Sequence, residues 1–429
     1  MRMLLLLLLT VLFQGGLFEL GCRDEENNLV DWYYLYKLPH EYFDRNTTSS
    51  GFRYAFMTSA GSGKWQLSER TVNDSASIPG RTLQPVLDES GSSSLALLYN
   101  DEPPENSTDG LRGHTKGVVA TDGTSGFWLV HSVPKYPPPL GQSYQYPSSG
   151  KLFGQSYLCI SVAADQMELI GMQLLLNEPH VYSFRIPEEL QDRFPRLVKV
   201  TQMETDESPP YWKVLDLTSR GGTTFHSFAK NRFFKKELYA DFIAPALQVG
   251  LQVETWQHGA GNLPSECSHW PVFNVKDVKV TEDYHFSTLK DHSKWAVSSN
   301  SDKEYICVGD INRQEHQKER GGGSVCSQLS SVVAVYRASV TSIENCTQEE
   351  SNKKCSHPPY RAPKMVRYDF KVTRNISVRW FNKHGTYSTN ITCATQSVAD
   401  PQLNRTTKSS EPLPVRGGPP DVSVHDTSR

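Results

Sequence analysis

The sequence contains an internal repeat, and this repeat constrains the fold more than any other feature. Residues 114–130 align with residues 292–308 without a gap, at a constant offset of 178 positions. Each copy begins with His-x-Lys-x-x-Val, continues through a turn-rich stretch of seven residues and ends with an aromatic residue three positions before a Val. Such self-similarity indicates a duplicated structural unit. We expect each copy to form a β-hairpin that carries His-x-Lys on its first strand.

The pairs His114–Lys116 and His292–Lys294 are suited to phosphate chemistry. Residues two apart on a strand lie on the same face, so each His stands beside its Lys. An ammonium group stabilises charge on a phosphate oxygen, and an imidazole can attack phosphorus or protonate a leaving oxygen. If the halves face one another about a pseudo-twofold axis, one His stands on each side of a phosphodiester. The competing interpretation is a duplicated structural hairpin whose His and Lys face solvent.

The N-terminus predicts export. One Arg precedes an apolar run at residues 4–13, which ends in small residues. This layout is typical of a secretory signal peptide, and we place it at residues 1–21, before Cys22. The run is too short to span a bilayer, which needs about 20 apolar residues. No later segment is long and apolar enough, so we expect no stable membrane span.

Two further features fit an oxidising compartment. The chain has eight cysteines and no CxxC pair, which favours disulfides over zinc ribbons or redox dithiols. We identify no convincing metal site and expect no cofactor. Seven Asn-x-Ser/Thr sequons are candidate glycosylation sites, and only some need be occupied. They lie at Asn46, Asn73, Asn106, Asn345, Asn375, Asn390 and Asn404.

Short apolar runs alternate with turn clusters from about residue 30 to residue 340. The runs predict strands at 32–36, 95–99, 127–130 and 305–308. Longer mixed patterns predict helices over 187–194, 227–247 and 326–337. Strands mixed with helices in this way favour an α/β or α+β layered fold. Residues 348–429 differ, with sequons and a Pro/Gly-rich end, and we expect a partly disordered extension.

Several strings, in order, resemble the deoxyribonuclease II family. They lie at 32–39, 94–104, 112–117, 127–134, 291–295, 307–313 and 320–324. The resemblance implies a phospholipase D-like pseudo-dimer of two repeats, each with a mixed β-sheet flanked by helices. We place the first repeat at 22–180 and the second at 181–347. The family implies an acid endonuclease that cuts double-stranded DNA without metal and leaves 3′-phosphate ends. It also implies lysosomal degradation of DNA from dying or engulfed cells, with secretion as an alternative, and is compatible with a homodimer.

Carried onto this chain, the resemblance gives His114, Lys116, His292 and Lys294 the catalytic roles. One His forms a phosphohistidine and the other protonates the departing 5′ oxygen, and the sequence does not tell which is which. His131 and Asn312 are supporting candidates, and for His131 a purely structural role is equally consistent. The family pattern also implies three disulfides, namely Cys22–Cys159, Cys267–Cys346 and Cys307–Cys326.

Two other functions remain open. The same chemistry suits a phospholipase D-like phosphodiesterase acting on lipid, and an inactive secreted glycoprotein that binds nucleic acid is a third interpretation. The charge bears on the partner. The formal charge of −3 gives no reason to expect nucleic acid at neutral pH, but protonation of all 13 His would change it to +10. Because an unperturbed His has a pKa of about 6.5, we expect attraction to DNA to grow toward pH 5.

Overall fold

The computed structural model describes residues 19–40, 50–88, 93–105, 110–345, 374–382 and 385–393. The chain divides into two compact units, residues 1–363 and 364–429. In the second unit the described residues form one antiparallel hairpin of β18 (Arg374–Asn382) and β19 (Gly385–Cys393). The predicted signal peptide, apart from its last three residues, lies outside the described residues, as does most of the predicted extension.

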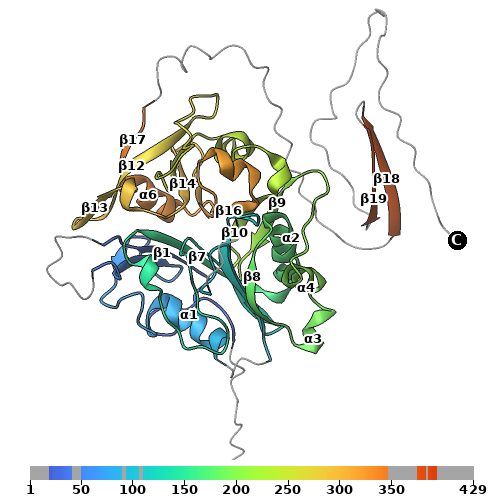
Figure 1. The fold of residues 1–429 in the computed structure, drawn as a ribbon, viewed down its shortest axis with the longest axis horizontal. Coiled ribbons are helices and arrows are strands. Elements are labelled where there is room, and N and C mark those ends of the chain that lie inside the picture. Colours follow the sequence, from blue (N-terminus) through green and yellow to red (C-terminus); the bar gives the residue numbers. More distant parts are fainter. Residues whose placement is uncertain are drawn as a thin grey trace, which may run out of the picture. The chain divides into compact units, whose positions relative to one another are not determined.

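The first unit contains two β-sheets (Figure 1). The first sheet has the order β3 (Gln66–Leu67), β2 (Tyr54–Thr58), β1 (Trp32–Lys37), β7 (Gln155–Ala163), β6 (Ser125–His131), β5 (Lys116–Thr121), β4 (Leu95–Asn100) and β8 (Val181–Arg185). The second has the order β13 (Tyr284–Ser287), β12 (Val272–Thr281), β11 (Leu251–Glu254), β14 (Trp295–Ser298), β15 (Ile306–Gly309), β16 (Gly322–Ser327), β10 (Thr224–Lys230) and β9 (Trp212–Thr218), and β17 (Val340–Ile343) pairs with β12.

The two sheets repeat one strand order. In the first, β4, β5, β6, β7 and β1 are consecutive neighbours, and in the second β11, β14, β15, β16 and β10 are. Together with the flanking helices this confirms the predicted layered α/β fold of two repeats. The strand pairs of the first sheet are all antiparallel among the described residues, so the predicted mixed sheet is found only in the second, where β11 and β12 are parallel.

The local sequence explains where the first helix begins. The helices are α1 (Ile78–Leu87), α2 (Met167–Asn177), α3 (Glu188–Gln191), α4 (Pro195–Thr201), α5 (Ala244–Leu247) and α6 (Ser330–Ser339). The first begins where the Ser77 side chain accepts a hydrogen bond from the amide of Gly80. The helix predicted over 227–247 is wrong for most of its length, because β10 continues to Lys230 and only short 3-10, π and α turns follow.

One core joins the two sheets. Alternate residues of β1 contribute to different cores: Trp32, Tyr34 and Tyr36 pack with residues of the second sheet and of α2 and α6, whereas Tyr33 and Leu35 pack toward α1. Both faces of this strand are buried, and period-2 geometry therefore explains its unbroken apolar run from Trp32 to Tyr36. Figure 1 shows β1 and β7 running between α1 and the elements of the second sheet.

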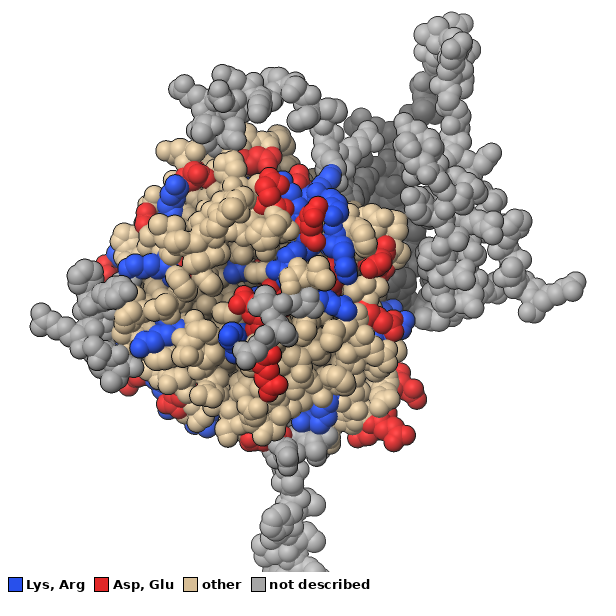
Figure 2. Space-filling view, viewed as in Figure 1, with Lys and Arg blue, Asp and Glu red and all other residues tan. Residues whose placement is uncertain are grey.

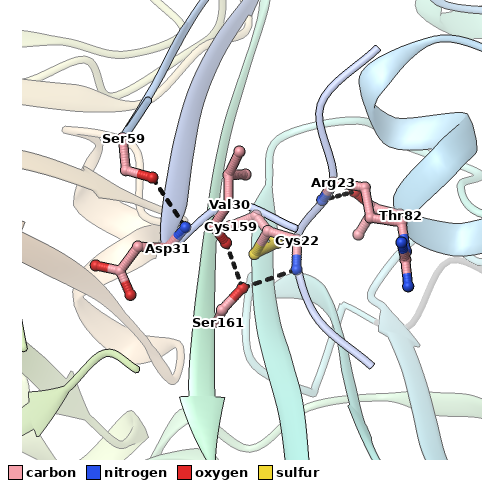
Figure 3. The surroundings of a disulfide bond; sticks show 8 residues. All are labelled: Cys22, Arg23, Val30, Asp31, Ser59, Thr82, Cys159 and Ser161. Carbon is pink, nitrogen blue, oxygen red and sulfur yellow. Dashed lines mark hydrogen bonds between the residues drawn. A yellow bond between two sulfur atoms is a disulfide. The ribbon is translucent and has the colours of Figure 1, made fainter. Parts of the chain in front are cut away.

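Each of the equivalent strands β7 and β16 carries one cysteine of a disulfide bond. Cys22–Cys159 ties the N-terminal segment to β7, and Cys307–Cys326 joins β15 to β16. Figure 3 shows the first, where the Ser161 hydroxyl accepts from the amide of Cys22 and donates to the carbonyl of Val30. These are two of the three pairs that the resemblance implies. Cys267 is also disulfide-bonded, and its implied partner Cys346 lies outside the described residues.

The sequons are partly visible. Asn73 and Asn345 are exposed, and Asn375 and Asn390 lie on β18 and β19. Asn46, Asn106 and Asn404 lie outside the described residues. No helix among the described residues is long and apolar enough to cross a membrane.

Candidate active site

The repeated segments form two hairpins with the same register. In β5 and β6 Gly117 pairs with Val130, and in β14 and β15 Trp295 pairs with Val308. The offset of 178 residues carries one pair onto the other. Each His lies just before its strand rather than on it, because β5 begins at Lys116 and β14 at Trp295. The predicted hairpins are therefore confirmed, with His-x-Lys at their entrance.

Each His is held by the opposite half. The amide of His114 donates to the carbonyl of Gly321, and the amide of His292 donates to the carbonyl of Gly154, both at 2.9 Å. The two glycines stand just before β16 and β7, which are equivalent strands. Position 113, next to His114, can hold only glycine, because a Cβ there would lie 1.8 Å from the carbonyl oxygen of Asn177. Each half of the molecule therefore positions the His of the other half through a backbone hydrogen bond.

One cavity of about 330 Å³ collects the predicted residues. Its wall includes both His-Lys pairs and Asn312, so five of the six candidates meet there. His131 is not part of the wall. It is buried, its Nδ1 accepts from the amide of Val133, and its ring packs against Tyr136 and Tyr157.

The surroundings of His114 are charged. The Asp101 carboxylate binds Lys116 Nζ, accepts from Arg320 Nη2 at 2.9 Å and lies 4.0 Å from His114 Nε2. On its other side, His114 Nδ1 is 2.7 Å from the carbonyl oxygen of Asp310. A carbonyl only accepts, so Nδ1 carries the proton and a neutral ring keeps its Nε2 lone pair. Burial raises the pKa of Asp101, but Lys116, His114 and Arg320 outweigh it, and the pKa is lowered.

The surroundings of His292 are aromatic. Phe153 stacks on the His292 ring at 4.5 Å between centroids, and Trp256 meets it edge-on at 3.8 Å. His258 in turn packs against Trp256 at 4.3 Å. Beneath the ring, Lys294 Nζ donates to the carbonyl of His292 at 2.6 Å. The Nε2 atom of His292 is buried and has no hydrogen-bond partner among the described residues.

Burial shifts the pKa of both histidines. It lowers the pKa of His292 to about 2, with Lys294 and Lys116 adding repulsion, and it lowers that of His114 well below its usual range. The pKa of the buried His131 is also lowered. These three rings are therefore neutral at pH 5 in the protein without DNA, and the net charge stays below the upper limit of +10.

Three buried acids lie close to the same cations. Burial raises the pKa of Asp310 to about 7, and Thr115 Oγ1 donates to its carboxylate at 2.7 Å. Burial also raises the pKa of Glu254 and of Asp291. The pKa of Lys294 is lowered to about 8 by its burial and by Lys116. At acidic pH the charge beside the cavity becomes more positive, because Lys294 is protonated and the Asp310 carboxyl group is neutral.

The sequence did not indicate four of the residues in the wall, namely Asp101, Arg320, Trp256 and His258. Asp101 and Arg320 do lie in strings that resemble the family, but they are far from either His-x-Lys in the sequence. The basic segment at 230–236 lies outside the cavity wall. Lys230 is buried against backbone carbonyls, Arg232 pairs with Glu178, and Lys235 pairs with Glu319.

The surface charge is mixed. Figure 2 shows Lys and Arg side chains interspersed with Asp and Glu over the face in view. Among the described residues, no group of His, Cys, Asp and Glu side chains is arranged to hold a metal ion. The wall of the cavity carries the imidazoles of His114, His258, His292 and His316, the ammonium groups of Lys116 and Lys294, and the Arg320 guanidinium.

Comparisons with known proteins agree on one family. A family model described as Deoxyribonuclease II matches residues 21–346. Plancitoxin-1 of Acanthaster planci is 40% identical over 80% of this chain and 97% of its own length. Deoxyribonuclease-2-alpha is 38% identical in Mus musculus and 36% in Sus scrofa, each over 80% of this chain and at least 95% of the relative.

Proposed function

Because the chain belongs to the deoxyribonuclease II family, we propose that it is an acid endodeoxyribonuclease that hydrolyses double-stranded DNA through a phosphohistidine intermediate. One observation carries the mechanism: two His-Lys pairs, one from each half, line one cavity. Lys116 and Lys294 bind the non-bridging oxygens, which places phosphorus between the two imidazoles. This arrangement suits in-line displacement.

His114 is the better nucleophile of the two. Its Nδ1–H is committed to the carbonyl of Asp310, so the Nε2 lone pair is available for attack. In the first step Nε2 forms a bond to phosphorus, the bond from phosphorus to O5′ breaks, and His292 donates its proton to O5′. In the second step His292 takes a proton from water, the water oxygen bonds to phosphorus and the P–N bond breaks. The product strand ends in a 3′-phosphate.

His292 acquires its proton when DNA binds. In the empty site its pKa is about 2, because the ring is buried beside two lysines. A phosphodiester between the lysines brings negative charge next to the ring, which raises the pKa of His292. Binding therefore takes up a proton, and DNA affinity rises as the pH falls. This coupling accounts for an acid enzyme whose catalytic histidines are neutral when the site is empty.

Other parts of the function rest on the family and on the sequence. We propose a lysosomal enzyme that reaches its compartment through the secretory pathway and degrades DNA from dying or engulfed cells. The signal-peptide layout and the disulfides support this assignment. Dimerisation and the boundary between repeats at residues 180 and 181 stay predictions. The lipid phosphodiesterase is disfavoured by the several relatives that are named deoxyribonuclease-2.

A plasmid-nicking assay at pH 5 in the presence of EDTA tests the proposal. We expect the wild-type protein to nick DNA under these conditions and to leave 3′-phosphate and 5′-hydroxyl ends. The His292→Ala variant should lose this activity, whereas His285→Ala, which removes an exposed ring on β13, should retain it. Loss of nicking under EDTA, or full activity of His292→Ala, would contradict the mechanism.

A further inference from the structure

The cavity wall next to His292 contains two aromatic rings that the proposed chemistry does not use. Trp256 lines the cavity and contacts His292, and His258 lines it beyond Trp256. The two rings are inclined by 34° with centroids 4.3 Å apart, so they form a near-stacked pair. The equivalent wall beside His114 has Asp101 and Arg320 instead. The wall also includes the exposed ring of His316, near Arg320, but among the described residues of the wall only the His292 side offers a near-stacked pair of rings.

The outer ring of this pair is accessible and held in place. His258 is exposed, while Trp256 is half-buried. The Nε2 atom of His258 is 2.6 Å from the carbonyl oxygen of Leu289, which fixes the plane of the ring. The next residues in the wall, Gly259 and Ala260, are small and exposed. A flat group can thus approach the rings from the cavity.

In-line displacement decides which part of the substrate reaches the rings. The leaving oxygen departs on the side opposite the nucleophile, so O5′ faces His292 when His114 attacks. The sugar and base attached to O5′ belong to the nucleotide downstream of the scissile phosphate. This nucleotide must therefore extend along the His292 wall, and the upstream nucleotide along the charged wall near Asp101 and Arg320.

We propose that Trp256 and His258 form a subsite that binds the base of the downstream nucleotide by stacking. This inference rests on the proposed function, because it uses His292 as the proton donor to O5′. Every base has a π-face, so stacking gives affinity without sequence preference. On the side of Arg320 the described wall offers the single ring of His316 and no near-stacked pair. The subsite thus gives the active site a direction along the strand.

Abasic substrates test this direction. A short DNA with one cleavable phosphodiester is prepared intact, with an abasic residue directly downstream, and with an abasic residue directly upstream. Loss of one base–aromatic stack should lower kcat/KM by a factor between about 5 and about 150. We expect a loss in this range for the downstream abasic substrate and less than about 3-fold for the upstream one.

Ring variants identify the surface responsible. His258→Ala should lower kcat/KM on intact DNA and remove the difference between the two abasic substrates. His258→Phe keeps a ring and should keep the difference. Phe184→Ala, which removes an aromatic side chain that is 54% exposed on β8, should leave all three rates unchanged. As a readout that does not depend on cleavage, 2-aminopurine placed downstream should be quenched on binding to His292→Ala, and much less so in the double variant with His258→Ala.

The possible outcomes distinguish failure of the proposed subsite from failure of the proposed function. If the intact substrate is not cut at pH 5 with EDTA, the proposed function fails. If it is cut but both abasic substrates lose activity equally, or if His258→Ala keeps the downstream preference, the subsite is wrong while the function stands. A stronger effect upstream would place the rings on the other nucleotide and overturn the assignment of His292 as well.

Discussion

The two half-sites share a backbone and differ in their surroundings. Each His amide binds a glycine carbonyl of the opposite half at 2.9 Å, and each hairpin has the same register. Yet His114 lies near a carboxylate and a guanidinium, whereas His292 lies between aromatic rings. The duplication therefore sets where the two imidazoles stand, and the walls around them set what each can do.

The difference arises at equivalent positions. Tyr99 of β4 pairs with Gly117, and Glu254 of β11 pairs with the equivalent Trp295. Two residues after each of these stands Asp101 in one half and Trp256 in the other. A single position thus holds an anion beside His114 and an indole beside His292. The different chemical roles that we propose for the two histidines follow from this difference in side chain.

The largest expected effects separate the two histidines by leaving group. On DNA, loss of the general acid in His292→Ala should lower kcat by roughly 10²- to 10⁴-fold. On a nucleoside 3′-(4-nitrophenyl phosphate) at pH 5, whose leaving group needs no proton, His292→Ala should recover the first step and release a burst of about one equivalent of nitrophenol, while turnover stays slow because the second step still needs His292. His114→Ala should be inactive on both substrates. Recovery by His114→Ala instead would reverse the roles of the two half-sites.

The second comparison concerns the disulfides of the two halves. Cys22–Cys159 spans 137 residues and Cys307–Cys326 spans 19. Loop-closure entropy predicts that removing the first lowers the free energy of unfolding by about 5 kcal/mol and removing the second by about 3 kcal/mol. Guanidinium unfolding of paired Cys→Ser variants measures both. A larger loss from the shorter loop would mean that native packing, and not chain entropy, governs the difference.

The charged wall should matter more for stability than the aromatic wall. In Asp101→Asn the buried Lys116 and the partly buried Arg320 lose their counter-ion. We expect the free energy of unfolding to fall by roughly 3 kcal/mol, with a smaller loss for Trp256→Phe. Because the folded pKa of Asp101 is lowered, its contribution is present above about pH 4 and is lost as the pH falls below this value. Urea unfolding should therefore show a smaller difference in the free energy of unfolding between Asp101→Asn and the wild type at pH 3 than at pH 5.

The smallest expected effect is on the alkaline side of the activity profile. The pKa of Asp310 is about 7, so its carboxyl group is neutral at pH 5 and becomes negative beside the phosphate site above pH 7. Asp310→Asn should therefore retain a several-fold larger share of its pH 5 activity at pH 8 than the wild type does. The free energy of unfolding of Asp310→Asn should also fall less between pH 4 and pH 8 than that of the wild type. A carboxyl group whose pKa is raised on folding contributes stability below its unfolded-state pKa, and this contribution is lost as the pH rises through the folded-state pKa. An unchanged profile would exclude Asp310 as the source of the acid preference.

The repeat in the sequence was sufficient to predict the two hairpins and the meeting of both His-Lys pairs. It worked because a gapless alignment preserves strand register, and register decides which side chains share a face. Strands such as β1 and β6 were predicted for a similar reason, since their apolar residues are contiguous. The family strings added the disulfide pairs Cys22–Cys159 and Cys307–Cys326, which no spacing rule could choose.

The walls of the site were not predictable in this way. Asp101 and Trp256 reach the cavity through strand pairing across the sheet, and Arg320 crosses from the second half to the first. Such contacts depend on tertiary placement and leave no period in the sequence. The histidine charge count gave only an upper limit for the same reason, because a count of His residues cannot include the burial that lowers the pKa of His114 and His292.

Trapping the covalent intermediate tests the division of labour most directly. His292→Ala and His114→Ala are each mixed with the nitrophenyl substrate, quenched at alkaline pH to preserve phosphohistidine, digested and mapped by mass spectrometry. We predict a nucleotidyl adduct on His114 in the His292→Ala protein and none in the His114→Ala protein. An adduct on His292 in the His114→Ala protein would contradict the assignment of the nucleophile to the charged half-site.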